Sequence, residues 1–123
     1  MLQQEEIHAL LGGNVAVLSK TIDQILTQTA ARLPEKTALI FGDKAISYRE
    51  LERLTNRVAH GLAALGVRKG DRVTLFAQNS AEWVQSYIGI AKTGAVINPV
   101  NAMLTAAELA YVVKDCGAKI LIT

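Results

Sequence analysis

Apolar and polar positions are most regular between residues 44 and 77, where they predict a strand, a helix and a second strand. In the middle of this stretch, apolar residues recur every three or four positions and would form one stripe along a helix. They are Leu51, Leu54, Val58, Leu62 and Leu65. Ser47 and Glu50 predict a capping box at the start of this helix, and Gly66 predicts its end. The polar face would carry Arg49, Glu52, Arg53, Asn56 and Arg57.

Packing, more than capping, is expected to stabilise this helix. Burial of a large apolar side chain is worth roughly 1.5–3 kcal/mol, whereas one cap contributes about 1 kcal/mol. The helix therefore needs a sheet against which its stripe can pack.

A further helix is predicted before this unit. Thr21 and Gln24 have the spacing of a capping box, and Pro34 would end the helix that they begin. Its apolar face comprises Ile22, Ile25, Leu26, Thr29, Ala30 and Leu33. Residues 1–20 are an N-terminal extension of uncertain structure, because a short face of Ile7, Leu10 and Leu11 is broken by Gly12-Gly13-Asn14.

A short β-hairpin is expected between these two helices. Residues 37–41 and 44–47 are strand-like runs joined by Gly42-Asp43. A two-residue connection with glycine in the first position favours a type II′ turn.

From residue 72 onwards, strands and helices alternate. Strands are expected over residues 72–77, 95–99 and 119–123, with Pro99 marking the exit of the second. Such an alternation is typical of a parallel sheet with right-handed crossovers. The predicted fold class is therefore α/β, a hairpin followed by a parallel β-α-β-α-β unit with helices on the sheet faces.

Two helices connect these strands. The first would begin at Asn79 or Ser80 and end at Gly94, and its expected buried face is Val84, Tyr87, Ile88 and Ala91. The second would begin with a capping box of Thr105 and Glu108 and end at Gly117. Its expected buried face is Leu109, Val112, Val113 and Cys116.

Composition limits the functions that the chain can have. The formal charge is +2, with basic residues scattered among acidic ones, which argues against nucleic-acid binding. A single cysteine, Cys116, favours a reducing compartment and is interpreted as a small apolar helix residue. No apolar run approaches the ~18 residues of a membrane span, and no signal-peptide pattern is present. We expect a cytoplasmic protein.

Candidate chemistry is sparse. Ligands of open parallel sheets bind beyond the carboxyl ends of the strands, here the loops 78–80 and 99–104. Neither loop holds a glycine, so neither resembles a phosphate cradle. Lys92-Thr93-Gly94 matches a β-lactamase triad but lacks its partner motif, and we interpret it as a helix end.

The remaining reactive side chains do not combine into a site. His8 and His60 lack metal or nucleophile partners, and His60 is expected to be exposed or half-buried. Trp83 and Tyr87 are interpreted as core or interface residues. Glu50 and Glu108 serve as caps and Asp71 lies in a turn. The sequence therefore predicts no catalytic, cofactor-binding or metal-binding residue in this chain.

Five motifs nevertheless follow one another in a specific order. They are residues 34–40 (PEKTALI), 46–51 (ISYREL), 66–73 (GVRKGDRV), 79–80 (NS) and 91–99 (AKTGAVINP). Together, from about residue 21 to residue 123, they resemble the N-terminal part of the adenylate-forming ligases. Asn98-Pro99-Val100-Asn101 is more similar to the acyl-CoA synthetase branch than to the peptide-synthetase branch.

The resemblance implies a two-step reaction in a full-length enzyme. A carboxylic acid attacks ATP, with Mg²⁺, to give an acyl-adenylate and pyrophosphate, and coenzyme A then displaces AMP. The family's phosphate loop, ribose-binding aspartate and adenylation lysine would all lie beyond Thr123, as would most of the acyl pocket. Residues 21–123 are thus expected to be an incomplete N-terminal domain, inactive alone.

Two alternatives remain open. The chain could be a truncated paralogue that associates through the apolar strand Ile120-Leu121-Ile122, because an exposed strand edge favours self-pairing. It could also be a small free-standing nucleotide-binding domain, which the absence of a phosphate cradle disfavours.

Overall fold

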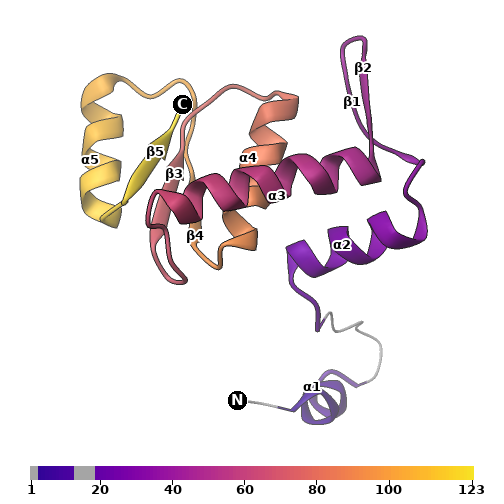
Figure 1. Ribbon diagram of the computed structural model, residues 1–123. Helices are drawn as coiled ribbons and strands as arrows, with labels where there is room; N and C mark the ends of the chain where they lie inside the picture. Colours follow the sequence, from indigo (N-terminus) through magenta and orange to yellow (C-terminus); the bar gives the residue numbers. More distant parts are fainter. Residues whose placement is uncertain (1–2, 13–18) are drawn as a thin grey trace.

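The computed structural model describes residues 3–12 and 19–123 (Figure 1). The described part of the chain begins with two helices, α1 and α2. Helix α1 spans Gln4–Leu10, and Gly12 follows it with φ of 69°. Gly13 and Asn14, also expected to break this helix, lie outside the described residues. Helix α2 spans Ile22–Arg32 and has the predicted capping box, in which the Gln24 side chain accepts from the Thr21 N–H at 3.1 Å.

The predicted hairpin is confirmed. Strand β1 spans Thr37–Phe41 and pairs antiparallel with β2, Lys44–Ser47. Gly42 has φ of 58°, and Asp43 does not have a positive φ, since only glycines do in the described part of the chain. A positive φ at the first turn residue alone is the pattern of a type II′ turn. The hairpin forms a separate two-stranded sheet beside the start of α3 (Figure 1).

Helix α3 spans Tyr48–Ala64 and begins as predicted, with the Ser47 hydroxyl accepting from the Glu50 N–H at 3.2 Å. The prediction that the Glu50 side chain completes a capping box at the Ser47 N–H was wrong. Both carboxylate oxygens of Glu50 accept from Arg53 instead. Gly66 follows the helix with φ of 88°.

The predicted apolar stripe of α3 is correct from Leu51 to Leu62 and wrong at its end. Leu51 and Leu62 are buried, but Leu65 is 69% exposed. Thr55, which the stripe omitted, is fully buried. Residue 65 already belongs to the turn into the next strand, and Thr55 is buried because a second helix packs against that part of α3.

The second sheet is parallel, as predicted. Strands β3 (Arg72–Leu75), β4 (Val96–Pro99) and β5 (Ile120–Ile122) lie in the order β4-β3-β5. Helix α4 (Ala81–Lys92) connects β3 to β4, and helix α5 (Ala106–Cys116) connects β4 to β5. The α/β class and the β-α-β-α-β unit are therefore confirmed.

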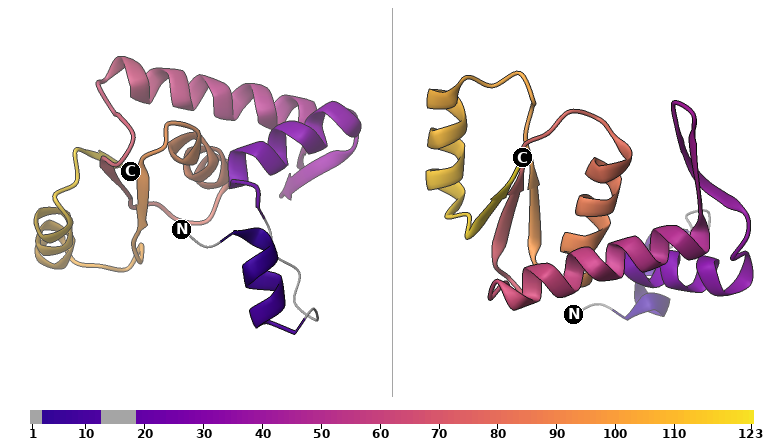
Figure 2. Two further views of the ribbon diagram at one scale, coloured as in Figure 1. Left: turned by 90° about the horizontal axis from the view of Figure 1, so that it is seen from below. Right: turned by 45° about the horizontal axis from the view of Figure 1, so that its top comes forward.

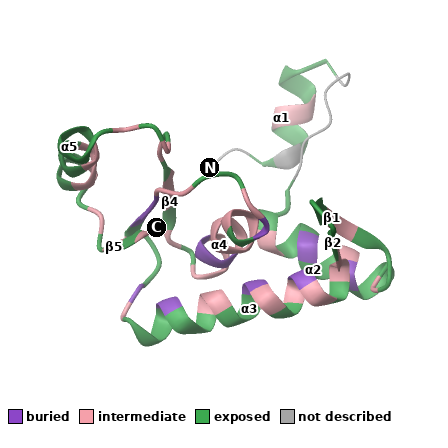
Figure 3. Cartoon of the chain, turned by 90° about the horizontal axis from the view of Figure 1, so that it is seen from above, coloured by how far each residue is buried: buried purple, intermediate pink, exposed green. Residues whose placement is uncertain are grey.

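The two faces of this sheet are covered unequally. Figure 2 shows α5 on one side of the three strands and α3 with α4 on the other. Val73 and Leu75 point to the α3–α4 side and form the core with Leu62, Val67 and Ile90. On the α5 side, Val96 is 52% exposed and Leu121 is 41% exposed. Figure 3 shows buried residues on the strands and on α3 and α4, with further ones on α2.

The predicted buried faces of α4 and α5 need correction. In α4 the buried residues are Ala81, Gly89 and Ile90, whereas the predicted face is only half-buried. Because α4 packs against both α3 and the sheet, it is covered on more than one side and one stripe does not describe it. In α5 the predicted face is the least exposed side, but no residue of this helix is buried. Within the described residues, no helix is long and apolar enough to cross a membrane.

Candidate functional site

The carboxyl ends of β3 and β4 form the place where this topology favours a ligand. The two strands are neighbours, and the chain leaves β3 towards α4 on one face and β4 towards α5 on the other. Loops that diverge in this way leave a crevice between them, at the topological switch point of a parallel sheet. The two loops singled out from the sequence therefore come together in the structure.

A crevice of about 380 Å³ lies at this point. We call it the switch-point crevice. Its lining residues come from the two loops and from the first turn of α4: Ala77, Gln78, Asn79, Trp83, Val100, Asn101, Ala102 and Met103. Its outer rim is open, because Met103 is 83% exposed and the three amide side chains are exposed as well.

Local hydrogen bonds fix the walls of the crevice. The Ser80 hydroxyl caps α4 by accepting from the Trp83 N–H at 3.0 Å. Asn101 Oδ1 accepts from the Met103 N–H at 2.9 Å, which holds the second loop in a tight turn. Trp83 stacks on Tyr87 with ring centroids 5.2 Å apart, and both residues are half-buried and pack against the core, which agrees with the core part of their interpretation as core or interface residues.

The crevice is chemically neutral. None of the described side chains that line it carries a formal charge, and neither of its loops holds a glycine. These residues do not fit the triphosphate of ATP, which needs backbone N–H groups at close approach or cations. The prediction that this chain holds no catalytic, cofactor-binding or metal-binding residue stays a prediction.

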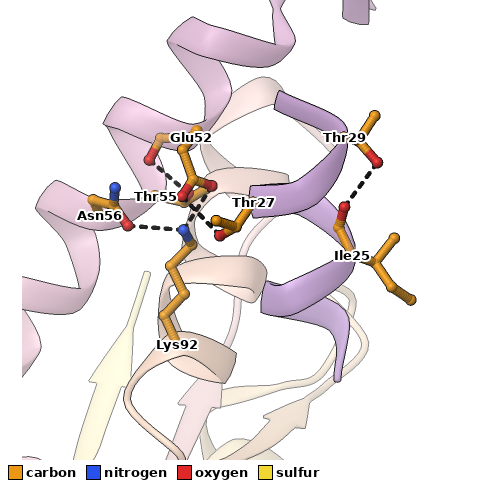
Figure 4. A network of polar contacts seen from close by, with 7 residues as sticks. All are labelled: Ile25, Thr27, Thr29, Glu52, Thr55, Asn56 and Lys92. Atoms are coloured by element: carbon orange, nitrogen blue, oxygen red, sulfur yellow. Dashed lines mark hydrogen bonds and ion pairs between the residues drawn. The ribbon is translucent and has the colours of Figure 1, made fainter. Parts of the chain in front are cut away.

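A polar network lies at the junction of α2, α3 and α4 (Figure 4) and was not predicted from the sequence. Lys92 Nζ lies 2.8 Å from Glu52 Oε2 and donates to Asn56 Oδ1 at 2.8 Å. The Thr27 hydroxyl of α2 donates to Glu52 Oε1 at 2.8 Å. Glu52 is thus half-buried against α4 and does not belong to the predicted solvent-facing stripe, whereas Asn56 contacts Lys92 but stays exposed, as predicted. Lys92-Thr93-Gly94 is a helix end, as predicted, with Gly94 at φ of 77°.

The structure explains why a sequence search does not find this network. The Lys92 side chain is only 8% exposed and that of Glu52 is 21% exposed. Two oppositely charged residues forty positions apart give no local signal, and only the packing of α3 on α4 brings them together. A hollow of about 440 Å³ beside the network is lined by residues that include Asp23, His60 and Thr93. His60 is exposed, as expected, and His8 is half-buried on α1.

Three carboxylates have lowered pKa values for structural reasons. The hydrogen bonds from Arg53 lower the pKa of Glu50. The Arg68 N–H, at 2.7 Å, and then Lys119 lower the pKa of Asp71. The Thr105 N–H, at 2.8 Å, lowers the pKa of Glu108 within its capping box. Each group therefore favours its ionised form, Glu50 in an ion pair, Asp71 in a turn and Glu108 in a cap, which does not suit a general acid.

Cys116 belongs to a small polar cluster between α5 and the sheet. Asn98 Nδ2 lies 3.1 Å from Thr74 Oγ1 and 3.3 Å from Cys116 Sγ. Thr74 is fully buried and Cys116 is half-buried. The apolar interpretation of Cys116 therefore requires correction, since its sulfur packs against polar partners that attach α5 to the sheet.

Comparisons with known proteins identify relatives along most of the chain. A model of the family described as AMP-binding enzyme matches residues 26–123. The chain is 37% identical over 106 residues to the mitochondrial medium-chain acyl-CoA ligase of Homo sapiens, covering 85% of this chain and 17% of that protein. It is 39% identical over 105 residues to a long-chain-fatty-acid–CoA ligase of Mycobacterium tuberculosis, covering 84% of this chain and 21% of that protein.

The chain is also similar to a peptide synthetase and to solved structures of related ligases. Tyrocidine synthase 2 of Brevibacillus parabrevis is 37% identical over 101 residues, which are 82% of this chain and 3% of that protein. The anthranilate CoA ligase AuaEII in complex with anthranoyl-AMP superposes with a TM-score of 0.79 at 36% identity, over 86% of this chain and 20% of that one. The inhibitor-bound N-terminal domain of FACL13 from Mycobacterium tuberculosis gives a TM-score of 0.79 at 38% identity, over 83% of this chain and 26% of that domain. The chain thus spans at most about a quarter of the proteins and domains named here.

Proposed function

The chain belongs to the AMP-binding enzyme family, and on this premise we propose that it is the N-terminal part of an ATP-dependent acyl-CoA synthetase. The full-length enzyme would convert a carboxylic acid, ATP and coenzyme A into an acyl-CoA, AMP and pyrophosphate, with Mg²⁺ assisting the first step. The observation that carries this proposal is the 37–39% identity to acyl-CoA ligases over 84–85% of the chain. The Asn98-Pro99-Val100-Asn101 motif favours this branch over the peptide synthetases.

In this proposal, residues 21–123 are an incomplete N-terminal domain that supplies framework. The core between α3, α4 and the sheet is buried, with its residues at most 5% exposed, whereas the α5 side of the sheet keeps apolar residues exposed. The described loops at the carboxyl ends of β3 and β4 do not fit the phosphates of ATP. The groups that hold ATP and Mg²⁺ are therefore assigned to other parts of the full-length enzyme, and these 123 residues are expected to be inactive alone.

A pyrophosphate-exchange assay with a panel of carboxylic acids tests this assignment. We expect no exchange by the 123-residue chain with aliphatic or aromatic acids. We also expect the coding sequence downstream of Thr123 to encode a Ser/Thr/Gly-rich phosphate loop, and the longer product to catalyse acid-dependent exchange. Exchange by the 123 residues alone would contradict the framework role, and a longer product that activates amino acids only would contradict the branch.

A second candidate function is association, as a truncated paralogue. The observation in its favour is that β5 lies at one edge of the parallel sheet, with Leu121 41% exposed. An uncovered strand edge can pair with another chain. Light scattering distinguishes this candidate, because a monomer at every concentration would exclude pairing of the purified chain. A cytoplasmic location also stays a proposal, which cell fractionation would test.

A further inference from the structure

We propose that the switch-point crevice binds an uncharged small molecule in which a carboxamide adjoins an apolar ring. This inference goes beyond the proposed function, because it requires neither ATP nor acid activation. It rests on the position of the crevice, the chemistry of its walls and the stacking of Trp83 on Tyr87.

The polar side of the crevice matches a carboxamide. Gln78, Asn79 and Asn101 each present a side-chain amide, with one acceptor oxygen and one donor nitrogen. A ligand carboxamide offers the same pair of groups and can therefore exchange hydrogen bonds in both directions with one of them. Since Asn101 Oδ1 already accepts from the Met103 N–H, its amide nitrogen is the group that this residue would direct to a ligand.

The apolar side matches a single ring. Trp83, Val100, Ala102 and Met103 provide apolar surface next to the amides. The volume of about 380 Å³ lies at the small end of ligand sites, which run from roughly 300 to 1,000 Å³. Trp83 is already held by its stacking on Tyr87, so a ligand would not have to order it on binding.

The absence of formal charge selects against anions. A carboxylate that enters the crevice loses part of its hydration and meets no charged partner among the described lining residues. A carboxamide of the same shape loses less hydration. Benzamide and benzoate, which differ only in this group, therefore form a matched pair of probes.

Trp83 provides a direct readout, because it is the single tryptophan of the sequence. Its fluorescence is measured while the 123-residue chain is titrated with benzamide or with benzoate. We expect benzamide to change the emission in a saturable way and benzoate to bind several-fold more weakly. No saturable change with benzamide, or equally tight binding of benzoate, would overturn the proposal.

Variants locate the binding. Asn79→Ala removes one neutral hydrogen-bonding group, so benzamide should bind about two- to tenfold more weakly. Met103→Ala removes part of the apolar wall and should also weaken binding. Leu65→Ala, an exposed position at the end of α3 and outside the crevice, is the matched control and should bind benzamide like the unchanged chain. Far-UV circular dichroism verifies that each variant is folded, and unchanged affinity in folded Asn79→Ala and Met103→Ala would refute the assignment.

Discussion

Leu62 and Leu65 lie three residues apart in sequence near the end of α3, yet only Leu62 contributes to the core. Leu62 is 5% exposed and packs with Val67, Val73, Leu75 and Ile90, whereas Leu65 is 69% exposed. Replacing Leu62 by alanine should lower the free energy of unfolding by about 2–5 kcal/mol, through lost burial and a cavity. A thermal melt followed by circular dichroism measures this loss.

The matched control for that prediction is Leu65→Ala. An exposed substitution away from special features usually changes stability by less than about 0.5 kcal/mol. Equal losses at the two positions would show that the α3 stripe does not pack as described.

Substitution of Lys92 should lower the stability more than substitution of most charged residues, because its ion pair with Glu52 is mostly buried. Lys92→Met would leave the Glu52 carboxylate without its cation and should cost about 3–5 kcal/mol in unfolding free energy. The double variant Lys92→Met, Glu52→Leu should recover much of this loss, because it removes both charges. Urea unfolding of the unchanged chain, Lys92→Met and the double variant measures the differences in unfolding free energy.

The exposed pair of Arg53 and Glu50 serves as the control for Lys92. Its side chains are 54% and 42% exposed, so Arg53→Met should cost at most about 1 kcal/mol. If Lys92→Met were no more destabilising than Arg53→Met, the network at the junction of α2, α3 and α4 would not stabilise the fold.

Asp71 should contribute acid sensitivity to the stability. Hydrogen bonds from the Arg68 N–H and from Lys119 hold its pKa below the ordinary value of 3.8. Its contribution is therefore present above the unfolded pKa and is lost as the pH falls through the lower, folded pKa. Asp71→Asn should be less stable than the unchanged chain near neutral pH.

Urea midpoints at several pH values test the role of Asp71. The gap between the two proteins should narrow as the pH falls below about 4, the ordinary range of an aspartate. The variant should keep part of the acid sensitivity, because the pKa values of Glu50 and Glu108 are also lowered. A gap that is constant with pH would contradict the assigned pKa of Asp71.

Helices α3 and α4 approach each other closely at Gly89. A Cβ atom at this position would overlap the Val58 side chain and lie 3.3 Å from the Thr55 carbonyl oxygen. Gly89→Ala should therefore lower the unfolding free energy by about 1–3 kcal/mol. Calorimetric unfolding measures this effect.

Gly61 offers the opposite case within α3. A Cβ atom there would meet nothing within 4 Å, so Gly61→Ala should raise stability by about 0.5–1 kcal/mol through helix propensity. A Gly89→Ala variant that is as stable as Gly61→Ala would show that the two helices are farther apart than described.

Element boundaries could be predicted from the sequence because their signals are local. The Thr21–Gln24 and Thr105–Glu108 capping boxes both form, and Gly117 takes the left-handed conformation that ends α5. Burial could not be predicted as well, since it depends on what packs against each helix. Thr55 is buried by α4, and α4 itself is covered on two sides, which no single stripe reveals.

The candidate site shows the same division between local and tertiary signals. The two loops beyond β3 and β4 follow from the strand order along the chain, and the structure brings them together in the switch-point crevice. The ion pair of Lys92 and Glu52 could not be predicted, because it requires the packing of α3 on α4. The order of the motifs indicated the family, which no individual charge or loop did.

At the scale of the whole molecule, the described residues combine a buried core with the neutral switch-point crevice. It matches the AMP-binding enzyme family over residues 26–123 and spans 17–21% of the length of the acyl-CoA ligases compared above. The described loops at the carboxyl ends of β3 and β4 supply neither glycine nor cation for phosphate groups. We therefore expect nucleotide binding to depend on residues outside this chain.

Isothermal titration calorimetry of the purified 123-residue chain with ATP and Mg²⁺ tests this claim most directly. The framework account predicts only the heat of dilution at every ratio of nucleotide to protein. Saturable heat with a stoichiometry near one would contradict it, because these residues would then hold the nucleotide by themselves.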